Sequence, residues 1–142
     1  AFGLVQLESL QNNIEVREEN FQKQISFFNK YPEMFENPVR QNGIRSGFLA
    51  FPILISDKAP FSRREFQIFL EERDIQTRVC FTGNVLRQPM TKNIRKRVDK
   101  RGYKNADAVM ARGVLLPLHH GMTDGMFERL HDVIDKFVKN FE

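Results

Sequence analysis

Hydrophobic side chains recur at helical spacing at the start of the chain. Leu7, Ile14, Phe21 and Phe28 follow one another at equal intervals, and Glu, Gln, Asn and Lys fill most positions between them. An apolar stripe of this kind predicts one long amphipathic helix. We expect it to end near Pro32, because proline disfavours helical geometry in the residue before it and lacks a backbone donor.

A strand and a second helix are predicted next. The stretch from Gly47 to Ile55 is short and continuously apolar, which is typical of a buried strand. Pro52 places this strand at a sheet edge or a bulge. Ser62 and Glu65 then form an S-x-x-E capping box, flanked by phenylalanines at the two positions of a hydrophobic staple. A helix from about Arg63 to Arg73 follows from these signals.

Alternation of apolar and polar residues reappears after this helix. It runs from Ile75 to Thr82 and predicts a strand with two different faces. A turn at Gly83 and an irregular basic stretch come next. A short helix is then expected over Ala106–Arg112, closed by Gly113.

A third strand and a last helix complete an α/β pattern of the α+β type. The strand is expected over Val114–Leu116, and Thr123 is placed to cap the last helix. We therefore expect a long helix followed by a small, mostly antiparallel three-stranded sheet with helices packed on it.

The chain is expected to form a single domain over residues 1–142. It would consist of a connecting helix at 1–31 and a sheet-and-helix core at 46–142, since no linker or repeat divides the sequence. The first residues already belong to an amphipathic pattern. We therefore expect the chain to start within a helix and to carry apolar surface meant for residues outside it.

Charge is distributed unevenly along the sequence. The net charge is +4, and the segment from Arg87 to Lys104 holds many basic residues against the single acid Asp99. Two interpretations stay open, a solvated surface segment and a surface that meets phosphate. No run of apolar residues reaches the roughly 18 that a spanning helix needs, and the start lacks a signal-peptide layout. A cytoplasmic protein with no membrane contact is expected.

Two histidines form one candidate site. His119 and His120 lie between Leu118 and Gly121 in a predicted strand-to-helix connection, where functional groups often gather. They could act as acid or base, or bind a hydroxyl or phosphate; alternatively, one packs and the other is solvated. No metal is expected, because the chain lacks H-E-x-x-H and Cys/His ligand arrays. The single cysteine, Cys80, is interpreted as a small buried hydrophobe.

A second candidate site is the turn Thr82-Gly83-Asn84 followed by Arg87. Glycine permits close backbone approach, asparagine offers a donor and an acceptor, and arginine can bind phosphate with two hydrogen bonds. The spacing alone indicates only a turn. No Walker loop, G-x-G-x-x-G or G-x-S-x-G motif accompanies it.

Seven short segments, spread over essentially the whole chain, carry a family resemblance. They are AFGLVQLE at 1–8, Arg17 with Asn20-Phe21, FPI at 51–53, APF at 59–61, IQTR at 75–78, FTGNVLRQP at 81–89 and LPLHHGMT at 116–123. Together they closely resemble the C-terminal part of the DegT/StrS family. Its members are fold-type I pyridoxal-phosphate enzymes, mostly sugar aminotransferases, together with nucleotide-linked 4-keto-6-deoxyhexose 3-dehydratases of lipopolysaccharide sugar synthesis.

The resemblance implies a role for the complete protein. It would modify a nucleotide-linked keto-deoxysugar by 3-dehydration or transamination, as a homodimer, with pyridoxal 5'-phosphate bound by a preceding large domain. Phe81, Gly83-Asn84 and Arg87 resemble the 3-dehydratase branch, whereas the Leu-Pro-Leu-His-His-Gly segment is closer to the aminotransferases. The branch stays open. The family's catalytic lysine or histidine does not lie in this chain, so we expect no catalytic residue here and no activity from this chain alone.

The resemblance also assigns substrate-binding residues. Asn84 and Arg87 are expected to help hold the sugar nucleotide, while His119 or His120 lines the sugar pocket. Two other functions stay open. The basic run could bind nucleic acid or an acidic partner, although it contains a single aromatic residue, Tyr103. The chain could also serve purely as a dimerisation or scaffold domain.

Overall fold

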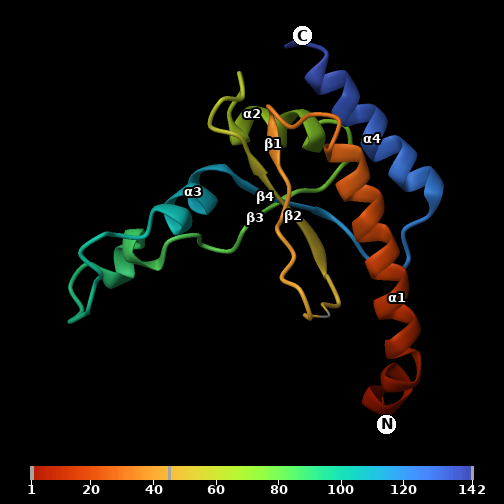
Figure 1. Cartoon of the computed structure of the whole chain (residues 1–142), viewed down its shortest axis with the longest axis horizontal. Helices are drawn as coiled ribbons and strands as arrows, with labels where there is room; N and C mark the ends of the chain where they lie inside the picture. The colour runs from red at the N-terminus through yellow and green to blue at the C-terminus, as the bar shows by residue number, and fades with distance from the viewer. Residues whose placement is uncertain (1, 45, 142) are drawn as a thin grey trace.

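The computed structural model describes residues 2–44 and 46–141, which form an antiparallel sheet with helices packed against it (Figure 1). The sheet order is β1-β2-β4-β3. In chain order the elements are α1 (Phe2–Phe28), β1 (Phe35–Glu36), β2 (Ala50–Ile55), α2 (Arg63–Glu71), β3 (Arg78–Val79), the 3-10 turns η1 (Val85–Arg87) and η2 (Pro89–Thr91), α3 (Lys104–Arg112), β4 (Gly113–Pro117) and α4 (Asp124–Val138).

One face of the sheet carries the core. Phe51, Ile53 and Ile55 of β2 are buried, whereas the residues between them are partly exposed. The buried strand residues pack with apolar side chains of three helices, which are Phe21 and Phe28 of α1, Phe66 and Leu70 of α2, and Leu130, Ile134, Phe137 and Val138 of α4. Burying each large apolar side chain contributes about 1.5–3 kcal/mol. The helices α1, α2 and α4 are therefore held on the same side of the sheet.

Local signals predict the helix boundaries well. The capping box is confirmed: Ser62 Oγ accepts a hydrogen bond from the Glu65 N–H at 3.2 Å, and Glu65 Oε2 accepts one from the Ser62 N–H at 2.7 Å. Thr123 caps α4 as predicted, since its Oγ1 accepts a hydrogen bond from Met126 N–H at 3.4 Å. The first helix ends before Pro32, also as predicted.

The sheet has one strand more than predicted. The additional strand, β1, pairs with the end of β2, and Phe35 lies opposite Ile55. A strand of two residues has no periodicity of its own, so the sequence pattern did not indicate it. The predicted antiparallel arrangement is confirmed, because all three pairs of neighbouring strands are antiparallel.

The predicted strand over Ile75–Thr82 is wrong in its extent. Only Arg78 and Val79 pair with β4. The backbone N–H of Thr77 instead donates to the Glu71 carboxylate at 2.6 Å. Phe81 has a φ of 51°, which is incompatible with a strand.

The helix predicted over Ala106–Arg112 begins earlier, at Lys104. Gly113 closes this helix as predicted, since it is the C-cap of α3. Gly113 has a φ of −77° and begins β4 directly. A Cβ at Gly113 would lie 2.6 Å from the carbonyl oxygen of Val109. Close packing, not a left-handed turn, therefore explains the glycine.

Apolar surface remains uncovered at the beginning of α1. Leu4, Val5, Leu7 and Leu10 are between 45% and 67% exposed. This confirms the expectation that the first helix carries apolar surface without a partner in the described part of the chain. None of the helices in that part is both long and apolar enough to cross a membrane.

Replacing the cap of α2 tests the most clearly predicted boundary. Ser62→Ala removes an acceptor for one of the unpaired N–H groups at the helix start, so we expect the free energy of unfolding to fall by about 1 kcal/mol. Ser26→Ala, on the exposed face of α1, is the matched control and should leave stability unchanged or slightly raised. Urea denaturation followed by circular dichroism measures both. Equal stability of the two variants would contradict the capping role.

Candidate functional site

The turn after β3 is fixed against α3. Gly83 has a φ of 65°, a left-handed backbone conformation that residues other than glycine rarely adopt. A Cβ at Gly83 would also collide with Cα and Cβ of Met110 in α3. The next residue, Asn84, caps η1 by accepting a hydrogen bond from Leu86 N–H through Oδ1 at 3.0 Å. Glycine is thus required both by the turn and by the close approach of the helix.

Asp107 of α3 joins the two predicted residues of this turn. Its Oδ1 accepts hydrogen bonds from Asn84 Nδ2 at 2.7 Å and from Arg87 Nε at 2.9 Å. Its Oδ2 accepts one from Arg87 Nη2, also at 2.9 Å. Sequence reasoning missed Asp107. The only available signal was an acidic residue in the first turn of a predicted helix, which is common for electrostatic reasons alone.

The two predicted residues differ in accessibility. Asn84 is only 5% exposed, and its side-chain amide is directed at Asp107 and the η1 backbone. The Arg87 side chain is 64% exposed. Its bonds to Asp107 use two of the five N–H donors of a guanidinium and leave three. Arg87 is therefore the member of this pair that can reach a ligand.

Hydrogen bonding keeps this cluster ionised at neutral pH. The hydrogen bond from Arg87, followed by the one from Asn84, lowers the pKa of Asp107 to about 2. The same contact raises the pKa of Arg87. Both partners therefore keep their charges throughout the physiological range.

The histidine loop between β4 and α4 is held by α1. The carbonyl oxygen of His119 accepts a hydrogen bond from Asn20 Nδ2 at 2.9 Å. Arg17 Nη2 lies 3.3 Å from His120 Nδ1. Both histidine side chains are exposed, and their ring centres are 6.5 Å apart. Arg17 and Asn20, which belong to one of the segments that resemble the family, thus support the loop.

The imidazole of His119 has a defined hydrogen-bonding pattern. Its Nδ1 accepts a hydrogen bond from the Gly121 N–H at 3.1 Å. In the neutral ring, an accepting Nδ1 assigns the proton to Nε2. His119 can therefore offer an N–H donor to a hydroxyl or phosphate oxygen outside the loop.

The structure does not bring the two candidate sites together within the described residues. The Asn84–Arg87 turn contacts α3, which leads into the Gly113 end of β4, whereas the histidine loop follows the Pro117 end (Figure 1). The two sites lie beyond opposite ends of one strand. A strand of this length spans on the order of 15 Å.

An apolar hollow occupies the sheet face that α1, α2 and α4 leave open. Its volume is about 540 Å³. Its lining includes Pro52, Leu54 and Leu115 of the sheet, Cys80 and Phe81 after β3, and Val109 of α3. Phe81 is 88% exposed, and its backbone has a positive φ. Because Cys80 and Phe81 lead directly into the Gly83 turn, the hollow lies beside the Arg87 site.

Comparison with known sequences identifies the family. Residues 1–137 match the sequence model of the DegT/DnrJ/EryC1/StrS aminotransferase family. The chain belongs to this family. The match extends over both candidate sites and confirms the resemblance that the sequence segments indicate.

Two curated relatives are similar to the chain. The lipopolysaccharide biosynthesis protein RfbH of Salmonella typhimurium is 31% identical over 99% of this chain. A dTDP-4-dehydro-2,6-dideoxy-D-glucose 3-dehydratase of Saccharopolyspora spinosa is 35% identical over 64% of it. The matched regions make up 31% and 20% of these two proteins. The chain thus spans no more than about a third of their length.

Solved structures of the family have the same fold. An aminotransferase from Psychrobacter cryohalolentis superposes with a TM-score of 0.81 and 14% identity, over 97% of this chain and 37% of its own. The Escherichia coli GDP-4-keto-6-deoxy-D-mannose-3-dehydratase with bound hydrated PLP gives 0.76 and 22% identity, over 92% and 33%. These likenesses confirm the α+β fold of this DegT-family chain.

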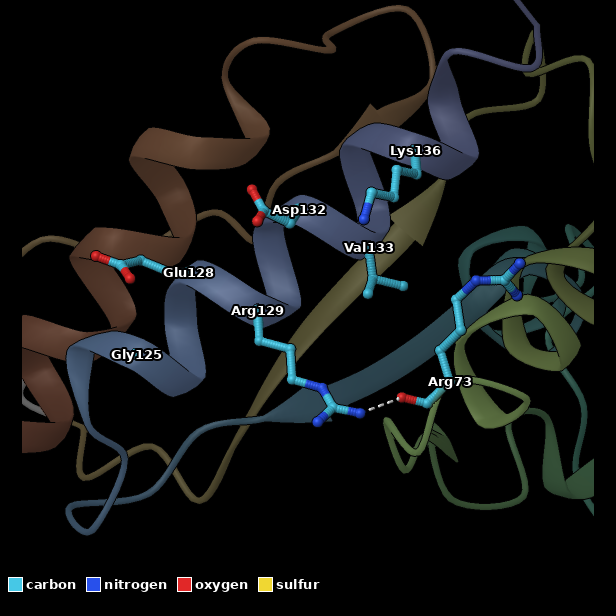
Figure 2. A pocket seen from close by; sticks show the side chains of 7 residues that line it. All are labelled: Arg73, Gly125, Glu128, Arg129, Asp132, Val133 and Lys136. Atoms are coloured by element: carbon cyan, nitrogen blue, oxygen red, sulfur yellow. Dashed lines mark hydrogen bonds between the residues drawn. The ribbon is translucent and has the colours of Figure 1, made fainter.

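A further hollow, on the outer side of α4, shows the features of a packing contact. Arg129 extends from α4 toward α2, and its Nη2 donates to the Arg73 carbonyl oxygen at 2.9 Å (Figure 2). Asp132 and Lys136 lie along the same helix, so basic and acidic groups alternate around the hollow. No single charge sign dominates it.

Cys80 does not have the features of a nucleophile. The thiol is half-buried, and desolvation raises its pKa. A raised pKa lowers the thiolate fraction at neutral pH. The interpretation of Cys80 as a small hydrophobe agrees with this environment.

His131 is a titratable group that sequence reasoning did not use. Its ring stacks on Phe27 with centroids 3.9 Å apart, and its Nε2 lies 3.0 Å from Gln24 Oε1. Burial, reinforced by the charge of Lys30, lowers its pKa from 6.5 to about 4, against the opposing influence of Asp135 and of Asp132. His131 therefore joins α4 to α1 as a neutral ring.

Acidification should loosen this contact. Between pH 6.5 and about 4 the unfolded chain binds the His131 proton more readily than the folded protein does, so the free energy of unfolding falls as the pH drops. Above pH 6.5 the contribution is fully retained. Its size is on the order of 1 kcal/mol after discounting for solvent screening. Urea denaturation at pH 7 and pH 5 measures it.

Variants identify the source of the effect. His131→Gln should reduce the loss of stability between the two pH values, whereas His120→Gln, which removes an exposed histidine, should not. A pH dependence that is the same in the wild type and in His131→Gln would assign the effect to other groups.

Proposed function

We propose that the chain is the C-terminal, substrate-facing part of a pyridoxal-phosphate-dependent enzyme. The complete protein would modify a nucleotide-linked keto-deoxysugar by 3-dehydration or transamination. The observation that carries the proposal is the family match over residues 1–137. The names of both relatives support a sugar substrate, since one is a lipopolysaccharide biosynthesis protein and the other a dTDP-sugar 3-dehydratase.

Arg87 is the residue that we propose contacts the diphosphate of the sugar nucleotide. Its guanidinium is exposed, held in one orientation by Asp107 and left with three N–H donors. Arginine suits this task because its planar fork matches phosphate oxygens. Asn84, which is buried, would contribute by shaping the turn that carries Arg87.

His119 and His120 are proposed to line the sugar pocket. The hydrogen bond from Gly121 leaves His119 Nε2 as a donor, and Asn20 fixes the backbone of the loop. Arg17 lies beside His120 and adds a second basic group. These groups can bind sugar hydroxyls, with no proton transfer required of them.

The cofactor would be held mainly by residues outside this chain. A pyridoxal-phosphate site needs a lysine or its equivalent near the aldehyde, a partner for the pyridine nitrogen and donors for the phosphate. In the described residues, neither of the two proposed substrate sites combines these groups. Pyridoxal phosphate would supply an electron sink at the substrate carbon. This chain would position the sugar nucleotide against it and exclude water.

Exposed apolar surface supports the proposal that another part of the protein binds the cofactor. The open sheet face and the start of α1 both present hydrophobic groups to solvent, including Leu4, Leu7 and Phe81. Exposed apolar surface of this kind usually marks a contact surface. We propose that the cofactor-binding part of the protein covers it, that the complete enzyme is a homodimer, and that this chain alone is inactive.

Steady-state kinetics of the full-length protein test the role of Arg87. Arg87→Ala should raise the KM for a nucleotide-linked 4-keto-6-deoxyhexose by roughly 10–100-fold, the loss expected for one charge-assisted hydrogen-bonding group. The effect on kcat should be smaller, because Arg87 binds away from the reacting carbons. Arg101→Ala, an equal loss of charge on the same basic segment, is the control and should leave KM within about twofold.

Two outcomes would contradict this assignment. An unchanged KM in Arg87→Ala removes the residue from the site. A wild-type protein without pyridoxal absorbance and without turnover of any such sugar nucleotide removes the proposed function itself. Product analysis with L-glutamate as amino donor separates the branches, since transamination adds nitrogen at C4 whereas dehydration removes the 3-hydroxyl.

A further inference from the structure

We propose that Asp107 is a positioning residue that holds the Arg87 guanidinium with its outer edge directed to the diphosphate of the sugar nucleotide. The inference rests on the proposed function, since it names the group that prepares Arg87 for that ligand. A single carboxylate of α3 receives three hydrogen bonds from the turn that carries Arg87.

The contact leaves a defined binding edge. Asp107 engages the N–H of Nε and one N–H of Nη2, which lie along the same edge of the planar guanidinium. One N–H of Nη1 and the second N–H of Nη2 point away from Asp107 and form the outer edge of the guanidinium. A phosphate can accept two parallel hydrogen bonds from that edge. Asp107 therefore restricts the orientation of Arg87 without occupying the donors that a phosphate needs.

The support of Asp107 is rigid. It lies in α3, whose Met110 packs directly against Gly83 at the start of the same turn. Asn84, almost fully buried, donates to the same carboxylate oxygen as Arg87. The turn and the helix thus form one unit. Holding a long side chain in one rotamer before binding reduces the entropy that the ligand must overcome.

A purely stabilising role explains the cluster less well. The Arg87 side chain is 64% exposed and that of Asp107 is 35% exposed. Ion pairs of this exposure contribute little to folding. The bidentate geometry, in contrast, has a direct effect on where the guanidinium points.

Charge balance distinguishes positioning from simple attraction. The Arg87–Asp107 pair has no net charge, and the low pKa of Asp107 maintains this balance at neutral pH. A phosphate would therefore be recognised by the aligned donors of Arg87 and not by a net positive charge of the pair. If attraction alone mattered, removing the Asp107 charge would strengthen binding. Positioning predicts the opposite sign.

The test uses the full-length protein and variants at two exposed acid–base pairs. Asp107→Ala should raise the KM for the sugar nucleotide about tenfold while kcat stays within about twofold. It should weaken binding of inorganic pyrophosphate by a similar factor. Asp99→Ala is the matched control, because Asp99 forms an exposed pair with Arg101 and the charge change is identical. It should leave both quantities unchanged or slightly improved.

A double-mutant cycle with Arg87→Ala gives the decisive comparison. If Asp107 acts through Arg87, adding Asp107→Ala to Arg87→Ala should not raise KM further. Asp107→Glu, which keeps the carboxylate, should recover part of the loss. Additive effects on KM, an unchanged KM in Asp107→Ala, or tighter pyrophosphate binding in that variant would each overturn the proposal.

Pyrophosphate binding also separates this inference from the proposed function. Binding that depends on Arg87 and Asp107, without turnover of sugar nucleotides, supports the positioning role and rejects the proposed activity. Turnover that is insensitive to Asp107→Ala does the reverse. Failure of the wild type to bind pyrophosphate and to turn over any sugar nucleotide rejects both.

Discussion

Burial of phenylalanine rings against one face of a small antiparallel sheet is the constraint on which the rest of the structure depends. Phe21 and Phe28 of α1 and Phe66 of α2 lie in a single core with Phe51 of β2. The rings of Phe28 and Phe51 stack at 5.5 Å, which fixes the long helix directly on the strand. Because α1, α2 and α4 all pack on this face, the other face keeps an apolar hollow bordered by α3. The open face and the loops at the two ends of β4 are therefore the parts of the chain that the core leaves accessible.

Local signals in the sequence predicted the helices because they act over a few residues. The Ser62 capping box and the Thr123 cap both involve neighbours within one helical turn, and both were correct. The sheet was harder to predict. The strand β1 exists only through its pairing with β2, and β3 is shortened by the φ of Phe81 and by the bond between Thr77 and Glu71. Such effects depend on tertiary contacts that no periodicity records.

The candidate sites show the same difference between local signals, which the sequence contains, and tertiary contacts, which it does not. The family resemblance selected Asn84, Arg87 and the two adjacent histidines, and the structure shows how neighbouring elements support each of them. The resemblance could not indicate Asp107. This residue lies 20 residues beyond Arg87 in the sequence and contacts it only when α3 packs on the turn. Supporting residues of this kind have ordinary local sequence environments. They are recognised by convergence in space, which sequence patterns do not encode.

Hydrogen bonds from α1 to the β4–α4 connection couple the position of the long helix to that of the histidine loop. Asn20 and Gln24, both buried, donate to the carbonyl oxygens of His119 and Pro117. A helix of 27 residues is about 40 Å long and resists bending, so its two ends move together. A shift in the packing at the beginning of α1 would therefore be transmitted to the histidine loop, which Asn20 holds from the second half of the helix. The packing of the exposed first turns of α1 is thereby coupled to the position of the histidine loop.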